Sequence, residues 1–213
     1  QQQIFEVSNE LYPVEGTFYA DSTFFEFFDF ELIHGDRAEV LDEPLMAVLT
    51  EKSALRFFGR KDVVGEILTL KGNNDARYLV SGVMADVPAN SHMNFDLLLS
   101  IETLRNPNNP TSLNSWNAGG AFTYIKLNSP KSAELVAQKM LDLKAKYVEE
   151  SNSIMVNPTL VAMTDIHLKS NLRNEMKPNG STAVVYVFSA IAIFILLIAA
   201  INYMNLATAR SAK

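Results

Sequence analysis

One apolar stretch near the C-terminal end constrains the fold of this chain most strongly. Residues 183–201 contain no charge and no proline, and Tyr186 and Ser189 are their only polar side chains. A helix of this length spans about 29 Å, the thickness of the hydrocarbon core of a bilayer. A buried helix of a soluble domain is the alternative, but such helices are usually shorter and seldom apolar on every face. We therefore predict a transmembrane helix over residues 182–208.

The charges that flank this stretch predict its orientation. Arg210 and Lys213 follow it, and no acidic residue does, so the positive-inside rule places residues 209–213 in the cytoplasm. Residues 1–181 are then extracytoplasmic. Because 16 basic and 24 acidic residues precede the stretch, that region carries a formal charge of −8. This charge argues against nucleic acid and anionic lipid as its partners.

The N-terminal region and the absence of cysteine bear on export. The first twelve residues lack the basic segment and apolar core of a signal peptide. We therefore expect an earlier segment, most simply a preceding transmembrane helix, to direct export of the domain. The chain contains no Cys, so no disulfide framework or thiolate site is expected.

The region before residue 102 predicts short strands and two helices. Asp21 can cap a helix over residues 22–28, and Thr50 can cap another that runs to Phe58 and ends at Gly59. Five phenylalanines between residues 24 and 30 favour core packing over a ligand-stacking platform. The predicted strands cover residues 30–33, 45–49, 66–71, 77–84 and 97–101, the third and fourth forming a hairpin.

A β-α-β unit is predicted downstream. Residues 121–127 alternate like a strand, Ser129 and Pro130 begin a helix, and residues 154–163 form a second strand. The helix carries apolar residues at spacings of three and four, namely Ala133, Val136, Met140, Leu143 and Tyr147.

The sequence lacks the motifs of an enzyme. The histidines, His34, His92 and His167, are far apart and match no metal-ligand spacing. No Gly-x-Ser-x-Gly elbow and no phosphate-binding glycine loop occurs. We therefore predict no catalytic residue, no metal site and no cofactor.

Two other features point to interactions. Asn202 and Asn205 lie three residues apart, so they share one face of the apolar helix and are candidates for packing against another helix. The headgroup region is an equally good place for them. The polar loop at residues 106–117 contains the only tryptophan, Trp116, which we take as a candidate contact for a substrate or partner.

Several motifs, taken together and in order, resemble the permease subunits of MacB/FtsX-type ABC transporters, in particular the long, duplicated permeases of Bacteroidetes-like bacteria. They cover nearly the whole chain: Ala20-Asp21-Ser22-Thr23-Phe24-Phe25 before Phe28-Asp29-Phe30 and Gly35-Asp36; Val48-Leu49-Thr50-Glu51 before Phe57-Phe58-Gly59; Val64-Gly65-Glu66; Asp86-Val87-Pro88-Ala89-Asn90-Ser91-His92 before Phe95-Asp96; and the segment from Ile201 to Lys213.

The resemblance implies an α+β periplasmic core domain followed by one transmembrane α-helix, in the bacterial inner membrane. It implies that residues 121–166 form a porter-like β-α-β subdomain, that about residues 20–117 form an inserted β-rich subdomain, and that the helix from residue 183 onward is the second transmembrane helix.

The resemblance also implies partners. These are a cytoplasmic ABC ATPase, a second permease copy or half in a dimer or pseudodimer, the lipid bilayer, and a periplasmic adaptor or substrate. ATP-driven motion would then be coupled to the periplasmic domain for efflux or mechanotransmission, and ATP hydrolysis would belong to the ATPase. The alternative hypothesis, from a different class, is the extracytoplasmic sensor domain of a membrane signalling receptor.

Overall fold

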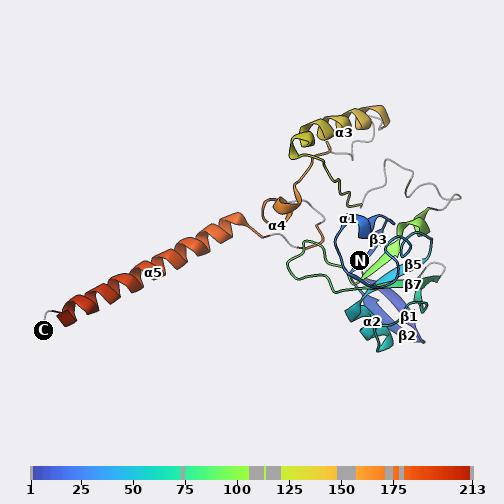
Figure 1. Ribbon diagram of the computed structural model, residues 1–213, viewed down its shortest axis with the longest axis horizontal. Coiled ribbons are helices and arrows are strands. Elements are labelled where there is room, and N and C mark those ends of the chain that lie inside the picture. The colour runs from blue at the N-terminus through green and yellow to red at the C-terminus, as the bar shows by residue number, and fades with distance from the viewer. Residues whose placement is uncertain are drawn as a thin grey trace. The chain divides into compact units, whose positions relative to one another are not determined.

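A computed structural model describes residues 2–72, 75–105, 113, 121–147, 157–170, 175–177 and 180–211. The chain divides into two compact units, residues 1–160 and residues 161–213. The first unit contains all of the strands in the described part of the chain, and the second contains only helices (Figure 1).

A mixed sheet forms the main body of the first unit. Its strands run in the order β2-β1-β6-β7-β5-β8-β3, and β4 pairs with one end of β7. Their bounds are β1 (Gln3–Val7), β2 (Glu10–Val14), β3 (Thr17–Ala20), β4 (Leu32–His34), β5 (Met46–Thr50), β6 (Ile67–Leu70), β7 (Ala76–Met84) and β8 (Leu97–Ser100). We call residues 3–105 the sheet body.

The pairing combines local hairpins with distant parallel contacts. The predicted hairpin is confirmed, since β6 and β7 are antiparallel. The hairpin of β1 and β2 turns at Ser8 and Asn9, whose φ angles are 51° and 68°, as a two-residue hairpin turn requires. In contrast, β5 lies parallel to β7, and β3 lies parallel to β8.

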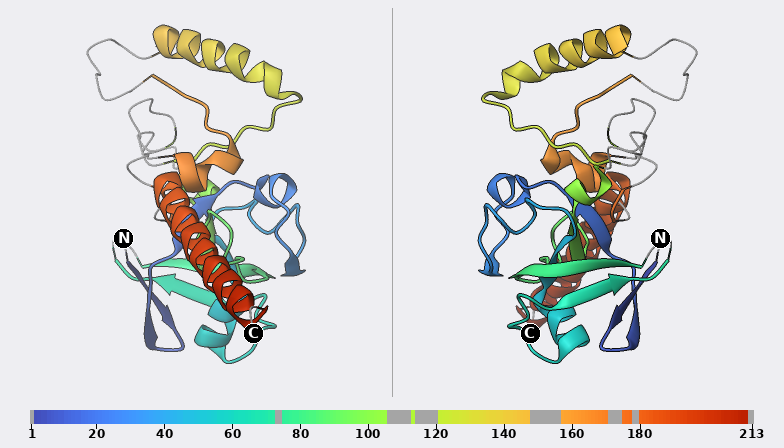
Figure 2. Two further views of the ribbon diagram at one scale, coloured as in Figure 1. Left: turned by 90° about the vertical axis from the view of Figure 1, so that its left-hand side faces the viewer. Right: turned by 90° about the vertical axis from the view of Figure 1, so that its right-hand side faces the viewer.

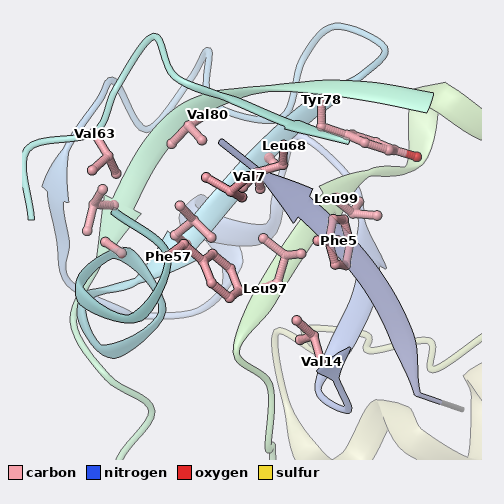
Figure 3. Packing of buried hydrophobic residues seen from close by; sticks show 14 residues of the cluster. Phe5, Val7, Val14, Phe57, Val63, Leu68, Tyr78, Val80, Leu97 and Leu99 are labelled. Atoms are coloured by element: carbon pink, nitrogen blue, oxygen red, sulfur yellow. The ribbon is translucent and has the colours of Figure 1, made fainter. Parts of the chain in front are cut away.

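Helix α2 (Glu51–Phe58) covers one face of the sheet. Its predicted caps are confirmed: the Thr50 hydroxyl accepts a hydrogen bond from the Ser53 N–H at 3.2 Å, and Gly59 ends the helix at φ 70°. Phe57 points from α2 into a core that it shares with Phe5, Leu97 and nine further residues of the strands (Figure 3). Full burial of each such side chain contributes about 1.5–3 kcal/mol.

The other face of the sheet packs on the segment between β3 and β5. Val48 and Leu98 alternate with the residues of the first core and are buried on this second side. Short helix α1 (Phe24–Phe27) lies in this segment. The Ser81 hydroxyl donates to the Val40 carbonyl at 2.5 Å, and this bond holds the segment against β7.

Beyond the sheet body the chain forms an arm, residues 121–147. Its helical part is confirmed: Ser129 caps the short 3₁₀ helix η2 (Pro130–Ser132), which leads into α3 (Ala133–Tyr147). Another 3₁₀ helix, η1 (Ile101–Leu104), ends the sheet body.

The prediction of two strands beside α3 is wrong for the described residues. Residues 121–127 are extended but belong to no strand, and residues 157–163, the described part of the second, contain none either. A strand requires a hydrogen-bonded neighbour, and alternation alone supplies none. The alternating side chains of residues 121–127 have a different use, described below.

The second unit begins with η3 (Met163–Asp165) and α4 (Ile166–Lys169) and ends in the long helix α5 (Thr182–Ser211). The 30 residues of α5 contain no glycine or proline and form one uninterrupted helix (Figure 2). Residues 182–210 are long and apolar enough to cross a membrane, and none of their most apolar window is buried.

Candidate functional site: an aromatic socket and an apolar helix

Helix α1 builds a cluster of aromatic rings on the second face of the sheet. The rings of Phe24 and Phe30 are stacked, with centroids 5.6 Å apart, and Phe95 meets Phe24 edge-on at 5.8 Å. Phe25 is fully buried, while the other rings of α1 are half-buried. The phenylalanines therefore pack on one another and on the sheet, as the packing interpretation of the sequence predicts.

Arg37 fixes the shape of this segment. Its guanidinium donates to the carbonyl of Phe25 at 2.7 Å and to the carbonyl of Phe30 at 2.6 Å. Because one acceptor is a backbone atom within α1 and the other is a backbone atom after it, one side chain holds the two ends of the aromatic run together.

The arm inserts one ring into the edge of this cluster. Tyr124 meets Phe28 edge-to-face, with centroids 5.0 Å apart and planes at 86°. The Tyr124 hydroxyl and His92 Nε2 share a hydrogen bond of 2.9 Å. Burial raises the pKa of the Tyr124 phenol, so this hydroxyl stays protonated at neutral pH. We call Phe28 and His92 the Tyr124 socket.

Negative charge gathers on the same segment. Residues 21–43 contain eight acidic residues and one arginine, a formal charge of −7, whereas the whole chain carries −6. The carboxylates are Asp21, Glu26, Asp29, Glu31, Asp36, Glu39, Asp42 and Glu43, all exposed. None of them forms an ion pair with another described residue. This surface repels polyanions.

The described residues contain no group of acids and histidines that could hold a metal ion. The phenol of Tyr78 is buried in the first core, where its oxygen lies 3.2 Å from the hydroxyl of Tyr19. Burial and this hydrogen bond raise the pKa of Tyr78 far above neutrality. Tyr78 and Tyr19 therefore form a structural hydrogen bond, and the Tyr78 phenol is not a proton donor for catalysis.

Helix α5 presents apolar side chains on all sides. Asn202 and Asn205 are exposed on it, three residues apart and hence on one face. Thr208 satisfies its hydroxyl within the helix by donating to the Met204 carbonyl at 2.8 Å. No hydrogen bond joins either Asn carboxamide to another described residue. The remaining predicted site residue, Trp116, lies outside the described residues.

The Tyr124–His92 pair was not predicted from the sequence. His92 was rejected as a metal ligand and otherwise belonged only to a motif of the family resemblance, and Tyr124 was one position of a predicted strand. The available signal was weak: aromatic residues at alternate positions 122 and 124 put both rings on one side of an extended segment.

Comparison with known proteins identifies the family. The model of the MacB-like periplasmic core domain matches residues 3–143. The chain therefore belongs to this family, the periplasmic domains of ABC-type permeases. With helix α5, the domain indicates a membrane-anchored protein whose main domain is periplasmic. No curated protein matches the chain.

Solved structures show similar folds. A domain of a protein described as a permease from Porphyromonas gingivalis is 25% identical, with a TM-score of 0.56 over 70% of this chain. The periplasmic region of MacB from Actinobacillus actinomycetemcomitans is 18% identical, with a TM-score of 0.46 over 68% of this chain and 63% of its own. The extracellular domain of the ABC-type transporter YknZ from Gram-positive bacteria is 12% identical, with a TM-score of 0.48 over 68% of this chain and 71% of its own. The chain spans 61% of the length of the Porphyromonas domain.

Proposed function

We propose that this chain is part of a permease subunit of a MacB/FtsX-type ABC transporter. In this proposal a cytoplasmic ABC ATPase hydrolyses ATP, and α5 carries the resulting motion to the periplasmic domain for efflux or mechanotransmission across the envelope. The chain itself is non-catalytic. The family match supports this assignment.

Helix α5 is the observation that carries the proposal. At 1.5 Å per residue its 30 residues measure about 45 Å, which spans a bilayer together with its interfaces. A helix without glycine or proline has no kink site, so a displacement at one end reaches the other as a rigid-body movement. Arg210 in its last turn supports a cytoplasmic C-terminal end.

The Asn face of α5 supports helix packing in the membrane. A carboxamide offers two donors and one acceptor, and in lipid each must find a partner. In our proposal Asn202 and Asn205 bond to another helix, either within the permease or in its second copy or half. Asn202→Leu with Asn205→Leu should weaken cross-linking between a Cys introduced on α5 and a Cys introduced on that helix. Ile198→Leu, one turn earlier on α5, is the control and should leave cross-linking unchanged.

The domain boundaries belong to the same proposal. Residues 1–181 are its periplasmic part, residues 182–208 its membrane span and residues 209–213 the beginning of its cytoplasmic part. Within the periplasmic part, residues 121–166 would complete a porter-like subdomain beside a β-rich subdomain of about residues 20–117. The loop at Trp116 remains its candidate contact for a substrate or periplasmic adaptor.

The deciding experiment reconstitutes the full-length permease in lipid with its ATPase. We expect ATP to change the distance between spin labels on two periplasmic elements. With an ATPase whose hydrolytic site is disabled, that distance should no longer alternate between its two values. A permease that moves its periplasmic domain equally well without any ATPase would contradict the proposal. A kinase domain downstream of Lys213 would instead favour the sensor alternative.

A further inference from the structure

The arm reaches the sheet body through an extended segment with two aromatic side chains on one side. Phe122 meets Phe18 of β3 with centroids 6.3 Å apart, and Tyr124 occupies the socket of Phe28 and His92. Tyr124 is half-buried, whereas Phe122 and its neighbours Thr123, Ile125 and Lys126 are exposed. The alternating side chains of this segment thus place two rings against the sheet body, and its backbone is not paired with a strand.

Helix α3 makes an exposed contact of its own, the 3.0 Å hydrogen bond that Lys144 Nζ donates to Asn157 Oδ1. None of its 15 residues is buried, and Leu135 and Leu143 are exposed. A helix that buries little surface gains little from packing, so its position depends on how its connection is held. The connection that precedes α3 is residues 121–127, and the ring contacts of half-buried Tyr124 and of exposed Phe122 join it to the sheet body.

The Tyr124 socket combines two different interactions. The edge-to-face contact with Phe28 fixes the position of the ring, and the hydrogen bond to His92 fixes its hydroxyl. Phe28 is held in turn, because Arg37 bonds the carbonyls of Phe25 and Phe30 around it. His92 contacts the same ring a second time, with centroids 5.7 Å apart. The socket therefore belongs to the sheet body, and Arg37 holds its Phe28 side in place.

We propose that Tyr124 is a positioning residue, which anchors the α3 arm to the sheet body by its ring and its hydroxyl. The anchor is the point at which the arm changes position when the permease works. This second statement rests on the function proposed above, whereas the anchor itself does not. The socket can release without unfolding the sheet, because its members lie outside the first core.

The test measures where α3 lies in the full-length permease in lipid, without nucleotide or ATPase. These 213 residues contain no Cys, so spin labels can be placed at chosen positions within them. One label goes on α2 as Leu55→Cys, and its partner on α3 as Lys139→Cys; both side chains are exposed. A second pair, Leu55→Cys with Arg77→Cys, reports on the sheet body alone.

Three variants separate the contributions. Tyr124→Ala removes ring and hydroxyl, and we expect the α2–α3 distance distribution to broaden and lose its single maximum. Tyr124→Phe keeps the ring and should give an intermediate width. Ile125→Ala removes an exposed neighbour in the same segment and should give the unchanged distribution. In all three variants the distance within the sheet body should stay as it is.

An unchanged α2–α3 distance in Tyr124→Ala would overturn the anchor. So would broadening of both distances, because Tyr124 would then maintain the fold rather than position the arm. If the α2–α3 distance distribution of Tyr124→Phe matched that of the parent protein or that of Tyr124→Ala, the proposal that ring and hydroxyl both contribute would be overturned. ATP and the ATPase are added last: if the anchor behaves as expected but the α2–α3 distance ignores ATP, the coupling function fails and the anchor stands.

Discussion

The sheet body and helix α5 use apolar residues in opposite ways. Every buried apolar side chain in the described part of the chain lies between Phe5 and Leu99, whereas α5 has more apolar character and buries none of its most apolar window. Apolar surface exposed to water on this scale would be costly for a soluble protein. The contrast indicates that the two regions have different solvents: protein interior for one and lipid for the other.

Helix α3 stands between these two cases. It is amphipathic rather than apolar throughout, and its charged side chains Lys139, Asp142 and Lys146 belong in water. Exposure of leucine thus has different meanings on α3 and α5, and the substitutions below use this difference.

The largest effect is expected in the first core. Phe5 is 0% exposed, and Phe5→Ala should lower the free energy of unfolding by about 3–5 kcal/mol, through lost burial and the cavity left behind. Ile4→Ala, the adjacent position on the opposite face of β1, is the matched control: Ile4 is 45% exposed, and its cost should stay within about 0.5 kcal/mol. Denaturant unfolding of residues 1–181 measures both. Equal costs would contradict the assigned faces of β1.

The next effect distinguishes lipid from water. Leu196 on α5 is 70% exposed and Leu135 on α3 is 59% exposed. Leu196→Arg should disfavour membrane insertion by about 3 kcal/mol, whereas Leu135→Arg should leave insertion unchanged because α3 lies in water. A glycosylation-based insertion assay gives the inserted fraction of each variant. If neither arginine changed that fraction, α5 would not span the membrane.

A smaller effect is expected at the start of α2. Thr50→Ala removes the hydroxyl that accepts from the Ser53 N–H, and should cost about 1 kcal/mol of unfolding free energy. Thr50→Ser keeps the hydroxyl and should cost less. The denaturation midpoints of the two variants provide the comparison. If Thr50→Ser were as unstable as Thr50→Ala, the stabilising group would be the methyl group of Thr50 and not the capping hydroxyl.

The smallest effect concerns an ion pair at the exposed end of β6. Lys71 Nζ lies 2.6 Å from Asp75 Oδ2, and this hydrogen bond, helped by the Gly72 N–H, lowers the pKa of Asp75. A lowered carboxyl pKa stabilises the fold above the unfolded value of about 4, and that contribution is lost as the pH falls through the folded pKa.

Asp75→Asn should therefore reduce stability slightly at neutral pH and converge with the parent protein in acid. Asparagine tolerates the φ of 40° at this position, so backbone strain should not add to the effect. Unfolding midpoints of both proteins across the acid range measure the difference. A difference that grew as the pH fell would reverse the sign of this interpretation.

Local signals in the sequence predicted the elements that depend on neighbouring residues. The caps Thr50 and Gly59 define α2, Ser129 and Pro130 begin the helical part of the arm, and β6 and β7 pair as the predicted hairpin. Strands β1 to β3 were missed, although Ser8 and Asn9 form a two-residue turn between alternating residues. Residues 121–127 show the opposite error. Their polar and apolar residues alternate, which predicted a strand, but the structure assigns no strand to this segment.

The sequence alone determined where this protein meets the membrane, because 19 uncharged residues in a row satisfy their backbone hydrogen bonds as a helix and can be solvated by lipid. It also determined the caps and periods of α2 and α3. Only the tertiary structure decided that β3 pairs with β8 and that Tyr124 meets Phe28 and His92. These contacts join residues far apart in the chain, and their free energy comes from burial and hydrogen bonds that no local pattern encodes.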